Sequence, residues 1–396
     1  MPVSGSSPPE LSWPVLGLDL GDNMFGNHRR GLVSLGAIAC VLILIGAACG
    51  SKSSTSSGSA GTSASSEGGK IALLLPETKT ARYETQDKPL FTAKVAELCS
   101  SCEVLYSNAD QDAAKQQSQA EAALTNGAKV LVLDPVDSAS AAAIVTKANQ
   151  QKVPVISYDR LINNAEIDYY ISFDNEQVGK LQGQALVDKL KSDGKSDGTI
   201  VMINGSPTDN NATLFKKGAH SVIDSSGLKV GAEYDTPDWS PDKAQAEMDQ
   251  ATTSLGKDGF VGVYAANDGT GGGAIAAMKG AGISPIPPTT GQDAELAAIQ
   301  RVLIGEQYMT VYKAVKPEAE GAATLAVALV QGQTPDASLV ATSVNNKTKD
   351  VPSVILTPVA VTKDNVKSTV VADGFWTAAQ ICTDAYKSAC TAAGIS

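Results

Sequence analysis

Short apolar runs alternate with longer amphipathic stretches between Lys70 and about Leu329. The runs are rich in Val, Ile and Leu, which is typical of strands that are buried on both faces of a sheet. The predicted strands are Ile71–Leu75, Val104–Tyr106, Val130–Leu133, Val153–Ile156, Ile200–Ile203, Val261–Tyr264 and Met309–Val311.

The stretches between these runs have helical periodicity. In the stretch that begins at Glu176, Val178, Leu181, Ala185 and Leu186 fall on one face, as an amphipathic helix requires. The alternation of strands and helices predicts an α/β fold whose parallel sheets are covered by helices on both faces. The predicted helices are Phe91–Leu98, Ala113–Thr125, Ala139–Gln150, Glu176–Leu190, Ala212–Ile223, Asp242–Leu255, Gly273–Ala281 and Ala294–Ile304.

The N-terminal region has the pattern of an export signal. Arg29 and Arg30 precede the apolar stretch Gly31–Ala48, which ends in small residues directly before Cys49. This cysteine resembles that of the bacterial lipobox, which is diacylated and becomes the first residue of the mature chain. The alternative is a transmembrane anchor, because about 18 apolar residues can span a bilayer. Both interpretations place the rest of the chain outside the cytoplasm.

The segment that begins at Met24 is a more ordinary signal start, so we expect translation to begin there, and we assign no function to residues 1–23.

Composition sets the domain count and excludes some partners. Ser51–Gly69 is a Ser/Gly tract that is expected to form a flexible linker, and the roughly 325 residues that follow are enough for two domains. The chain carries 42 acidic and 31 basic residues, a net charge of −11. This charge argues against nucleic acid and anionic lipid as partners, because a phosphate-binding surface needs a basic patch.

Four cysteines lie in the part of the chain after the Ser/Gly tract, and an even number outside the cell indicates disulfides. The favoured pairs are local, Cys99 with Cys102 and Cys382 with Cys390. A CxxC pair is also found in redox and zinc sites. However, this chain has no second CxxC, and His220 is the only histidine after the signal, so no metal site is expected.

Polar residues cluster at six strand ends, five of them after strands named above and one in the segment TTGQDA (289–294), and ligands of open α/β sheets bind at the carboxyl ends of strands. One such residue would be explained as a helix N-cap, but six groups together predict a binding site. Carboxylates accept hydrogen bonds from hydroxyls, Arg and Lys donate to them, and Asn does both, which suits a neutral ligand rich in hydroxyls. These residues are Asp134, Asp159, Arg160, Asp209, Asn210, Asn211, Asn267, Asp268, Gln292, Asp293 and Lys313.

Two aromatic residues could complete such a site. Trp239 lies in a polar turn (TPDWSPDK), where it is expected either to stack on a sugar face or to pack between lobes or loops. Tyr83, in the loop after the first strand, is a second candidate for stacking.

Several enzyme chemistries find little support. The segment 269–274 (GTGGGA) fits a dinucleotide-binding pattern, with Asp293 about 20 residues further on. It lies deep in the chain, however, and an exported protein has little access to NAD. The alternative is that its small residues allow close helix packing.

There is no Walker motif, and one histidine offers little for triad catalysis. Asp159, Asp209 and Asp293 could act as the paired carboxylates of a glycosidase. The adjacent Arg and Asn groups instead favour carboxylates that stay ionised and accept hydrogen bonds. Neither an enzyme nor a cofactor is therefore predicted.

Five longer segments resemble a known family, the periplasmic D-xylose-binding proteins of ABC importers and the related multiple-sugar-binding proteins. The similarity extends from about Lys70 to Trp376. The segments are YDRLINNAEIDYYISFDNEQVG (158–179), GSPTDNNATLF (205–215), ANDGTGGGAI (266–275), GQDAELAAI (291–299) and MTVYK (309–313).

The resemblance implies the type I periplasmic binding protein fold, in which two Rossmann-like lobes are joined by a three-strand hinge. The expected parts are the extension and signal 1–48, the tether 49–69, a first lobe of 70–176 and 315–345, a second lobe of 177–314 and 346–375, and a tail of 376–396 with Cys382 and Cys390.

The resemblance also implies the ligand-binding residues. Tyr83 stands where the family has Trp, so the choice of sugar stays open. The implied sugar ligands are Arg82, Asp159, Arg160, Asp209, Asn211, Asn267, Asp293 and Lys313, with Trp239 stacking on the ring.

The implied function is that of an extracytoplasmic lipoprotein, anchored to the membrane through Cys49. As a monomer, it would close on D-xylose or a similar aldose and deliver the sugar to an ABC permease. The alternatives are a sugar sensor that signals to a membrane receptor and a secreted carbohydrate-active enzyme.

Overall fold

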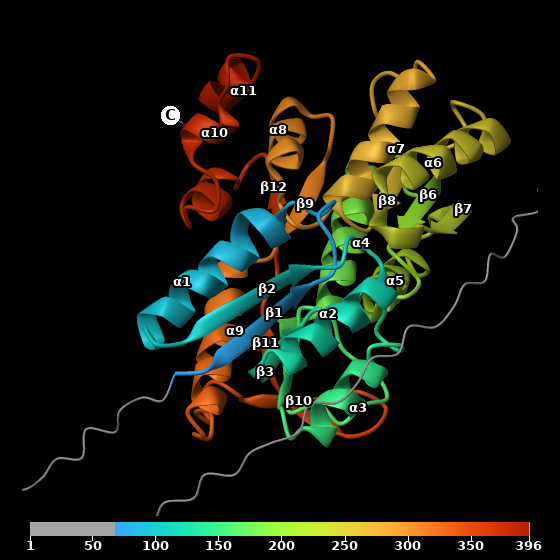
Figure 1. Ribbon diagram of the computed structural model, residues 1–396. Coiled ribbons are helices and arrows are strands. Elements are labelled where there is room, and N and C mark those ends of the chain that lie inside the picture. Colours follow the sequence, from blue (N-terminus) through green and yellow to red (C-terminus); the bar gives the residue numbers. More distant parts are fainter. Residues whose placement is uncertain (1–67, 396) are drawn as a thin grey trace, which may run out of the picture. The chain divides into compact units, whose positions relative to one another are not determined.

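The computed structural model describes residues 68–395 (Figure 1). The predicted export signal, Cys49 and all but the end of the Ser/Gly linker lie outside these residues. None of the helices within 68–395 is long and apolar enough to cross a membrane.

The first lobe is built on a seven-stranded sheet of order β10-β11-β5-β4-β3-β1-β2. All neighbouring strands are parallel except β10, which runs antiparallel to β11 at the edge. Its strands are β1 (Lys70–Leu75), β2 (Glu103–Asn108), β3 (Ala128–Leu133), β4 (Val155–Tyr158), β5 (Tyr169–Phe173), β10 (Thr342–Asn345) and β11 (Asp350–Leu356).

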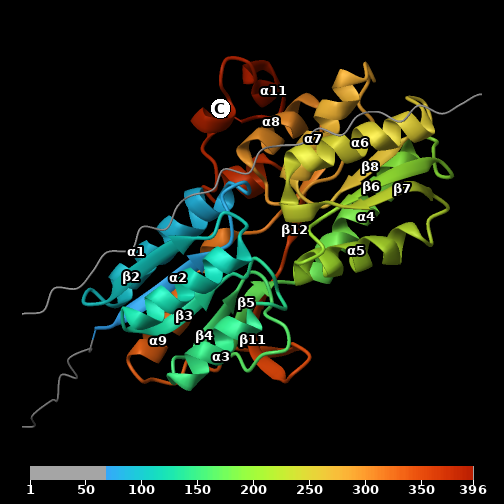
Figure 2. The ribbon, with the colours of Figure 1, turned by 45° about the vertical axis from the view of Figure 1, so that its right-hand side comes forward.

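Helices cover both faces of this sheet (Figures 1 and 2). Because successive strand residues point to opposite faces, Ile71 and Leu73 of β1 join the core under α1 and α9, whereas Ala72 and Leu74 join the core under α2 and α3. These helices are α1 (Lys88–Leu98), α2 (Ala113–Thr125), α3 (Ala142–Gln150) and α9 (Val315–Val330).

The second lobe repeats this arrangement around a parallel sheet of order β7-β6-β8 and an antiparallel pair, β9 and β12. Two isolated parallel bridges, from Val263 to Thr289 and from Gln292 to Val311, join β8 and β9 to the segment that lies between them in sequence. The strands are β6 (Thr199–Asn204), β7 (Lys229–Asp235), β8 (Gly262–Ala265), β9 (Met309–Tyr312) and β12 (Val359–Thr362).

Two pairs of helices enclose the β6 strand of this lobe. Ile200 and Met202 face the core beneath α4 and α5, and Val201 and Ile203 face the core beneath α6 and α7. The helices are α4 (Asn175–Ser192), α5 (Asn210–Ile223), α6 (Pro241–Leu255), α7 (Asp268–Gly280) and α8 (Leu296–Ile304).

The chain passes between the lobes three times, from β5 to α4, from β9 to α9 and from β11 to β12. The two lobes and the three connections confirm the predicted fold class. The division expected from sequence placed 346–375 with the second lobe, and the structure differs: β11 pairs in parallel with β5 of the first sheet. Val351 and Ser353 of β11 are fully buried there, so the third passage lies after β11.

After β12 the chain forms η3 (Lys367–Val371), and the C-terminal tail then packs against α8 through α10 (Ala378–Ile381) and α11 (Lys387–Ala392). Both predicted disulfides are present. Cys99–Cys102 closes the turn between α1 and β2, and Cys382–Cys390 joins α10 to α11. The second disulfide holds together two helices that are too short to be stable alone.

Glycines allow the helices of the second lobe to cross at backbone distance. A Cβ atom at Gly179 would lie 1.9 Å from the carbonyl oxygen of Phe215, and one at Gly218 would lie 2.0 Å from that of Glu176. Gly273, in the segment that fits the dinucleotide pattern, faces the carbonyl oxygen of Pro241 in the same way, at 2.2 Å. These glycines therefore serve helix packing, α4 against α5 and α7 against α6.

We expect Gly218→Ala to destabilise the protein by about 1–3 kcal/mol, because the added methyl group forces two backbones apart. Gly280→Ala is the matched control, since nothing lies within 4 Å of its added Cβ, and alanine there should be neutral or stabilising by up to about 1 kcal/mol. Urea unfolding measures both variants. Equal stabilities of the two variants would contradict the packing role of Gly218.

Candidate functional site

A narrow cavity of about 20 Å³ lies where the carboxyl ends of strands from both lobes meet. Nine of the ten site residues predicted from the sequence line it; Arg82 is the exception. Thr80, Phe215 and Gln292 complete the wall. The lining residues are Thr80, Tyr83, Asp159, Arg160, Asp209, Asn211, Phe215, Trp239, Asn267, Gln292, Asp293 and Lys313.

Lys313, just after β9, lies between two carboxylates of the cavity wall. Its Nζ is 3.5 Å from Oδ1 of Asp159 and 3.2 Å from Oδ1 of Asp293, and all three side chains are almost fully buried. Burial alone raises the pKa of Asp159, but Lys313, Arg82 and Arg160 together hold that pKa below its usual range. Burial lowers the pKa of Lys313, but Asp159 and Asp293 bring it above its ordinary value. Lys313 and Asp159 therefore remain charged at neutral pH.

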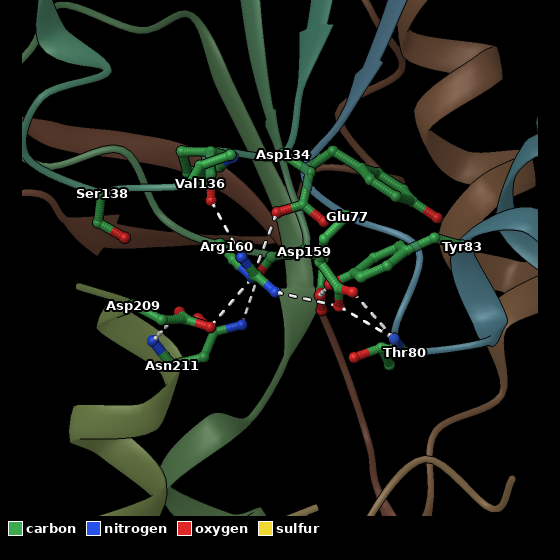
Figure 3. Close-up of polar contacts among 12 residues, drawn as sticks. Glu77, Thr80, Tyr83, Asp134, Val136, Ser138, Asp159, Arg160, Asp209 and Asn211 are labelled. Atoms are coloured by element: carbon green, nitrogen blue, oxygen red, sulfur yellow. Dashed lines mark hydrogen bonds and ion pairs between the residues drawn. The ribbon is translucent and has the colours of Figure 1, made fainter. Parts of the chain in front are cut away.

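Arg160, after β4, joins the first lobe to the second (Figure 3). Its Nε lies 3.0 Å from Oδ2 of Asp209 in the second lobe and 3.6 Å from Oδ1 of Asp134 in its own lobe. A terminal nitrogen lies 3.9 Å from Oε1 of Glu77, and another donates to the carbonyl oxygen of Pro135 at 3.3 Å. Burial raises the pKa of Asp134 well above its ordinary value, although Arg160 opposes this shift.

Asp209 is the N-cap of α5, and its carboxylate binds two other residues of the wall. Its Oδ1 accepts the backbone N–H of Asn211 at 2.8 Å, as an N-cap does. Its Oδ2 accepts the indole N–H of Trp239 at 3.0 Å. The Asn211 side chain in turn donates to the carbonyl oxygen of Asp159 at 3.0 Å, which is a second link across the lobes.

Trp239 is fixed in the wall by the short 3₁₀ turn η2 (Pro237–Trp239). Asp238 and Trp239 both adopt left-handed φ, 60° and 53°. The indole ring lies directly over Gly205, where an added Cβ would come within 2.0 Å of the ring. Phe215 meets the indole edge to face at a centroid distance of 6.2 Å. Phe215 was not predicted, because on an amphipathic helix an inward Phe has the pattern of a core residue.

Tyr83 opens the short π-helical segment η1 (Tyr83–Asp87) on the first-lobe side. Its hydroxyl donates to Oδ2 of Asp159 at 3.0 Å. The guanidinium groups of Arg82 and Arg160 lie 5.4 and 5.8 Å from its ring centroid. Tyr83 therefore combines an apolar surface with a hydrogen bond to a carboxylate of the wall.

Arg82 lies behind the wall and is the one implied ligand that does not line the cavity. Asp87 holds its guanidinium through two hydrogen bonds of 2.9 and 2.6 Å. Glu318 of α9 is a third partner, and Oδ1 of Asp159 lies 3.5 Å away. Because Asp87 and Glu318 occupy the guanidinium, Arg82 supports Asp159 from behind.

Gln292 was among the strand-end residues picked out from the sequence, although the family resemblance did not imply it as a ligand. Thr80 lies in a loop without any distinguishing pattern.

The sequence matches the family model of the periplasmic binding protein domain over residues 71–334. It is 40% identical to the D-xylose-binding periplasmic protein of Escherichia coli over 310 residues, which covers 77% of this chain and 90% of the relative. It is 38% identical to the multiple sugar-binding periplasmic receptor ChvE of Rhizobium radiobacter over 289 residues, which covers 69% of this chain and 81% of the relative.

Solved structures agree with this assignment. An ABC transporter solute-binding protein from Clostridium phytofermentans with bound β-D-glucose superposes with a TM-score of 0.73 at 29% identity, covering 79% of this chain and 99% of that one. The myo-inositol-binding protein of Caulobacter shares the fold, with a TM-score of 0.67 at 23% identity, covering 78% of this chain and 97% of that one. The chain therefore belongs to the family of periplasmic binding proteins that includes these sugar-binding relatives.

The buried Glu318 predicts a pH dependence of stability. Burial raises its pKa to about 8 despite Arg82, whereas an unfolded glutamate titrates near ~4.3. Between these values the folded state binds the proton more tightly, so the free energy of unfolding falls as pH rises. We expect Glu318→Gln to make this fall shallower between about pH 5 and about pH 9 in urea unfolding.

Glu320→Gln, at a partly exposed glutamate of the same helix, is the matched control and should keep the wild-type slope. If the free energy of unfolding fell with pH as steeply in Glu318→Gln as in the wild type, Glu318 would have the same pKa in the folded and unfolded states, contrary to the prediction.

Proposed function

We propose that this protein binds a single monosaccharide, D-xylose or a similar aldose, in the cavity between its lobes and delivers it to the permease of an ABC importer. The cavity is lined mostly by charged and amide side chains together with Tyr83, Phe215 and Trp239, a combination that suits a sugar. The D-xylose-binding and multiple-sugar-binding relatives support a sugar as the ligand and binding rather than catalysis as the activity.

One observation carries the proposal: two amide oxygens of the wall, Oδ1 of Asn211 and Oε1 of Gln292, are buried without a hydrogen-bond donor among the described residues. Oδ1 of Asp293, in contrast, is ion-paired with Nζ of Lys313 at 3.2 Å. A buried acceptor without a donor costs about 1–3 kcal/mol. Sugar hydroxyls are neutral donors that would satisfy both amide oxygens, and would also donate to Asp293, without adding charge to a site whose charges are already paired.

The remaining wall fits the other features of a sugar. Arg160 and Lys313 can donate to ring and hydroxyl oxygens, while Trp239 and Phe215 offer apolar surface to the C–H faces of the ring. The charged side chains hold one another in place, so few of their rotamers have to be ordered in the closed form.

The two-lobed construction supports a closing mechanism. A ligand that contacts Asp159 of the first lobe and Asp293 of the second gains both contacts only when the lobes are together. Binding therefore shifts an open–closed equilibrium towards the closed form, with the three connections between the lobes as the hinge. The closed form is the one that a permease would recognise. We further propose that the protein acts as a monomer on the outer face of the cell membrane, anchored through a lipid on Cys49.

The direct test is a thermal-shift screen of the purified protein against common pentoses and hexoses, followed by calorimetry. We expect a saturable shift and a micromolar dissociation constant with at least one aldose. Asp293→Ala should weaken that affinity by about 1–3 kcal/mol, because sugar and Lys313 both lose an acceptor.

Asp249→Ala, at an exposed aspartate of α6 outside the cavity, is the control and should bind like the wild type. No shift with any monosaccharide would overturn the proposed function. Unchanged affinity in Asp293→Ala would place the binding site elsewhere.

A further inference from the structure

The turn that presents Asp293 to the cavity is strained. Asp293 and Ala294 adopt φ of 96° and 52°, and neither is a glycine. Each such residue costs about 1–3 kcal/mol and persists only where its surroundings enforce it. The position of the Asp293 carboxylate in the wall therefore depends on the groups that hold this turn.

Asp268, the first residue of α7, is the centre of those groups. Its side chain is fully buried and does not line the cavity. Its Oδ2 accepts the backbone N–H of Glu295 at 2.9 Å and the hydroxyl of Thr310 at 2.9 Å. Its own backbone N–H donates to the carbonyl oxygen of Gln292 at 2.9 Å. Asp268 thus binds the chain on both sides of the strained turn.

Thr310 of β9 links Asp268 to the strained turn itself. Its hydroxyl donates to Asp268 and accepts the backbone N–H of Ala294 at 3.2 Å. The carbonyl oxygen of Ala294 accepts the indole N–H of Trp376 at 2.8 Å. Both backbone polar groups of Ala294 are therefore satisfied by side chains, one of them directly bonded to Asp268.

Asp268 is itself held in place by a second set of donors. Oδ1 accepts from the side chain of Gln307 at 2.6 Å, and Gln307 in turn accepts from Nε of Arg301 at 3.0 Å. A terminal nitrogen of Arg301 donates to the carbonyl oxygen of Asp268 at 2.9 Å. The carboxylate is surrounded by donors that all point at it, so an amide could not replace it without turning an N–H towards another donor.

We propose that Asp268 is a positioning residue for ligand recognition: it does not touch the sugar but fixes the Asp293–Ala294 turn so that the Asp293 carboxylate faces the cavity. The proposal rests on the proposed function and assigns the role to a residue outside the wall. Thr310 transmits this role through its hydroxyl.

The test compares three variants by calorimetry, with the aldose that the wild type binds most tightly. Asp268→Asn loses an acceptor, and Thr310→Val keeps the shape of threonine but loses the hydroxyl. Each should weaken affinity about tenfold or more. Thr310→Ser retains the hydroxyl and should stay within about threefold of the wild type.

A control separates positioning from a general loss of stability. Asp168 is a partly buried aspartate of the first lobe, outside the cavity, that accepts the backbone N–H of Val155 at 2.8 Å. Asp168→Asn should lower the unfolding temperature and leave sugar affinity unchanged. Hydrogen exchange provides a readout without sugar: the amides of Ala294 and Glu295 should exchange faster in Thr310→Val than in Thr310→Ser.

The outcomes distinguish the two proposals. If the wild type binds an aldose and both Asp268→Asn and Thr310→Val bind it equally well, the positioning role is wrong and the proposed function stands. The same holds if Thr310→Ser weakens binding as much as Thr310→Val, or if Asp168→Asn weakens it as much as Asp268→Asn. If the wild type binds no aldose, both proposals fail.

Discussion

The arrangement of the site depends on the pairing of charges buried between the two lobes. Arg160 and Lys313 are almost fully removed from solvent, and so are the carboxylates of Asp159, Asp209 and Asp293. An isolated charge at this depth would cost several kcal/mol, so each needs a partner. The pair formed by Arg160 and Asp209 joins the lobes directly, and Lys313 lies on a chain segment that connects them. The same pairing that satisfies the charges therefore also defines the wall of the cavity.

After this pairing, nearly every charged group of the site already has a partner of opposite charge, and this favours a neutral polyhydroxylated ligand. The wall retains two amide oxygens, those of the Asn211 and Gln292 side chains, that can still accept hydrogen bonds. An ionic ligand would have to displace an existing partner, whereas a sugar hydroxyl only adds a bond. Close helix packing in the second lobe, the strained turn at Asp293 and the tail residue Trp376 then hold these groups in position.

Much of the site could be predicted from sequence because it obeys a local rule. Asp159 and Asn267 each follow a buried apolar strand, and the ends of parallel strands meet at one edge of a sheet. Arg82 could not be placed this way, since its partner Glu318 lies on a helix 236 positions further along the chain. Phe215 has the same pattern as a core residue. Strand β7 was missed because none of its residues is fully buried, so it forms no apolar run. The assignment of β11 depends on a long-range pairing with β5, which no local pattern encodes.

The central claim is that one sugar ring is bound by both lobes at once, and a crystal structure grown with the tightest-binding aldose tests it most directly. The account predicts a single ring in the cavity, with hydroxyls donating to Oδ1 of Asp293 and Oδ1 of Asn211 and with a C–H face against Trp239. Asp159 on the first lobe should contact the same ring. A sugar bound outside the cavity, or held by residues of one lobe only, would contradict the account.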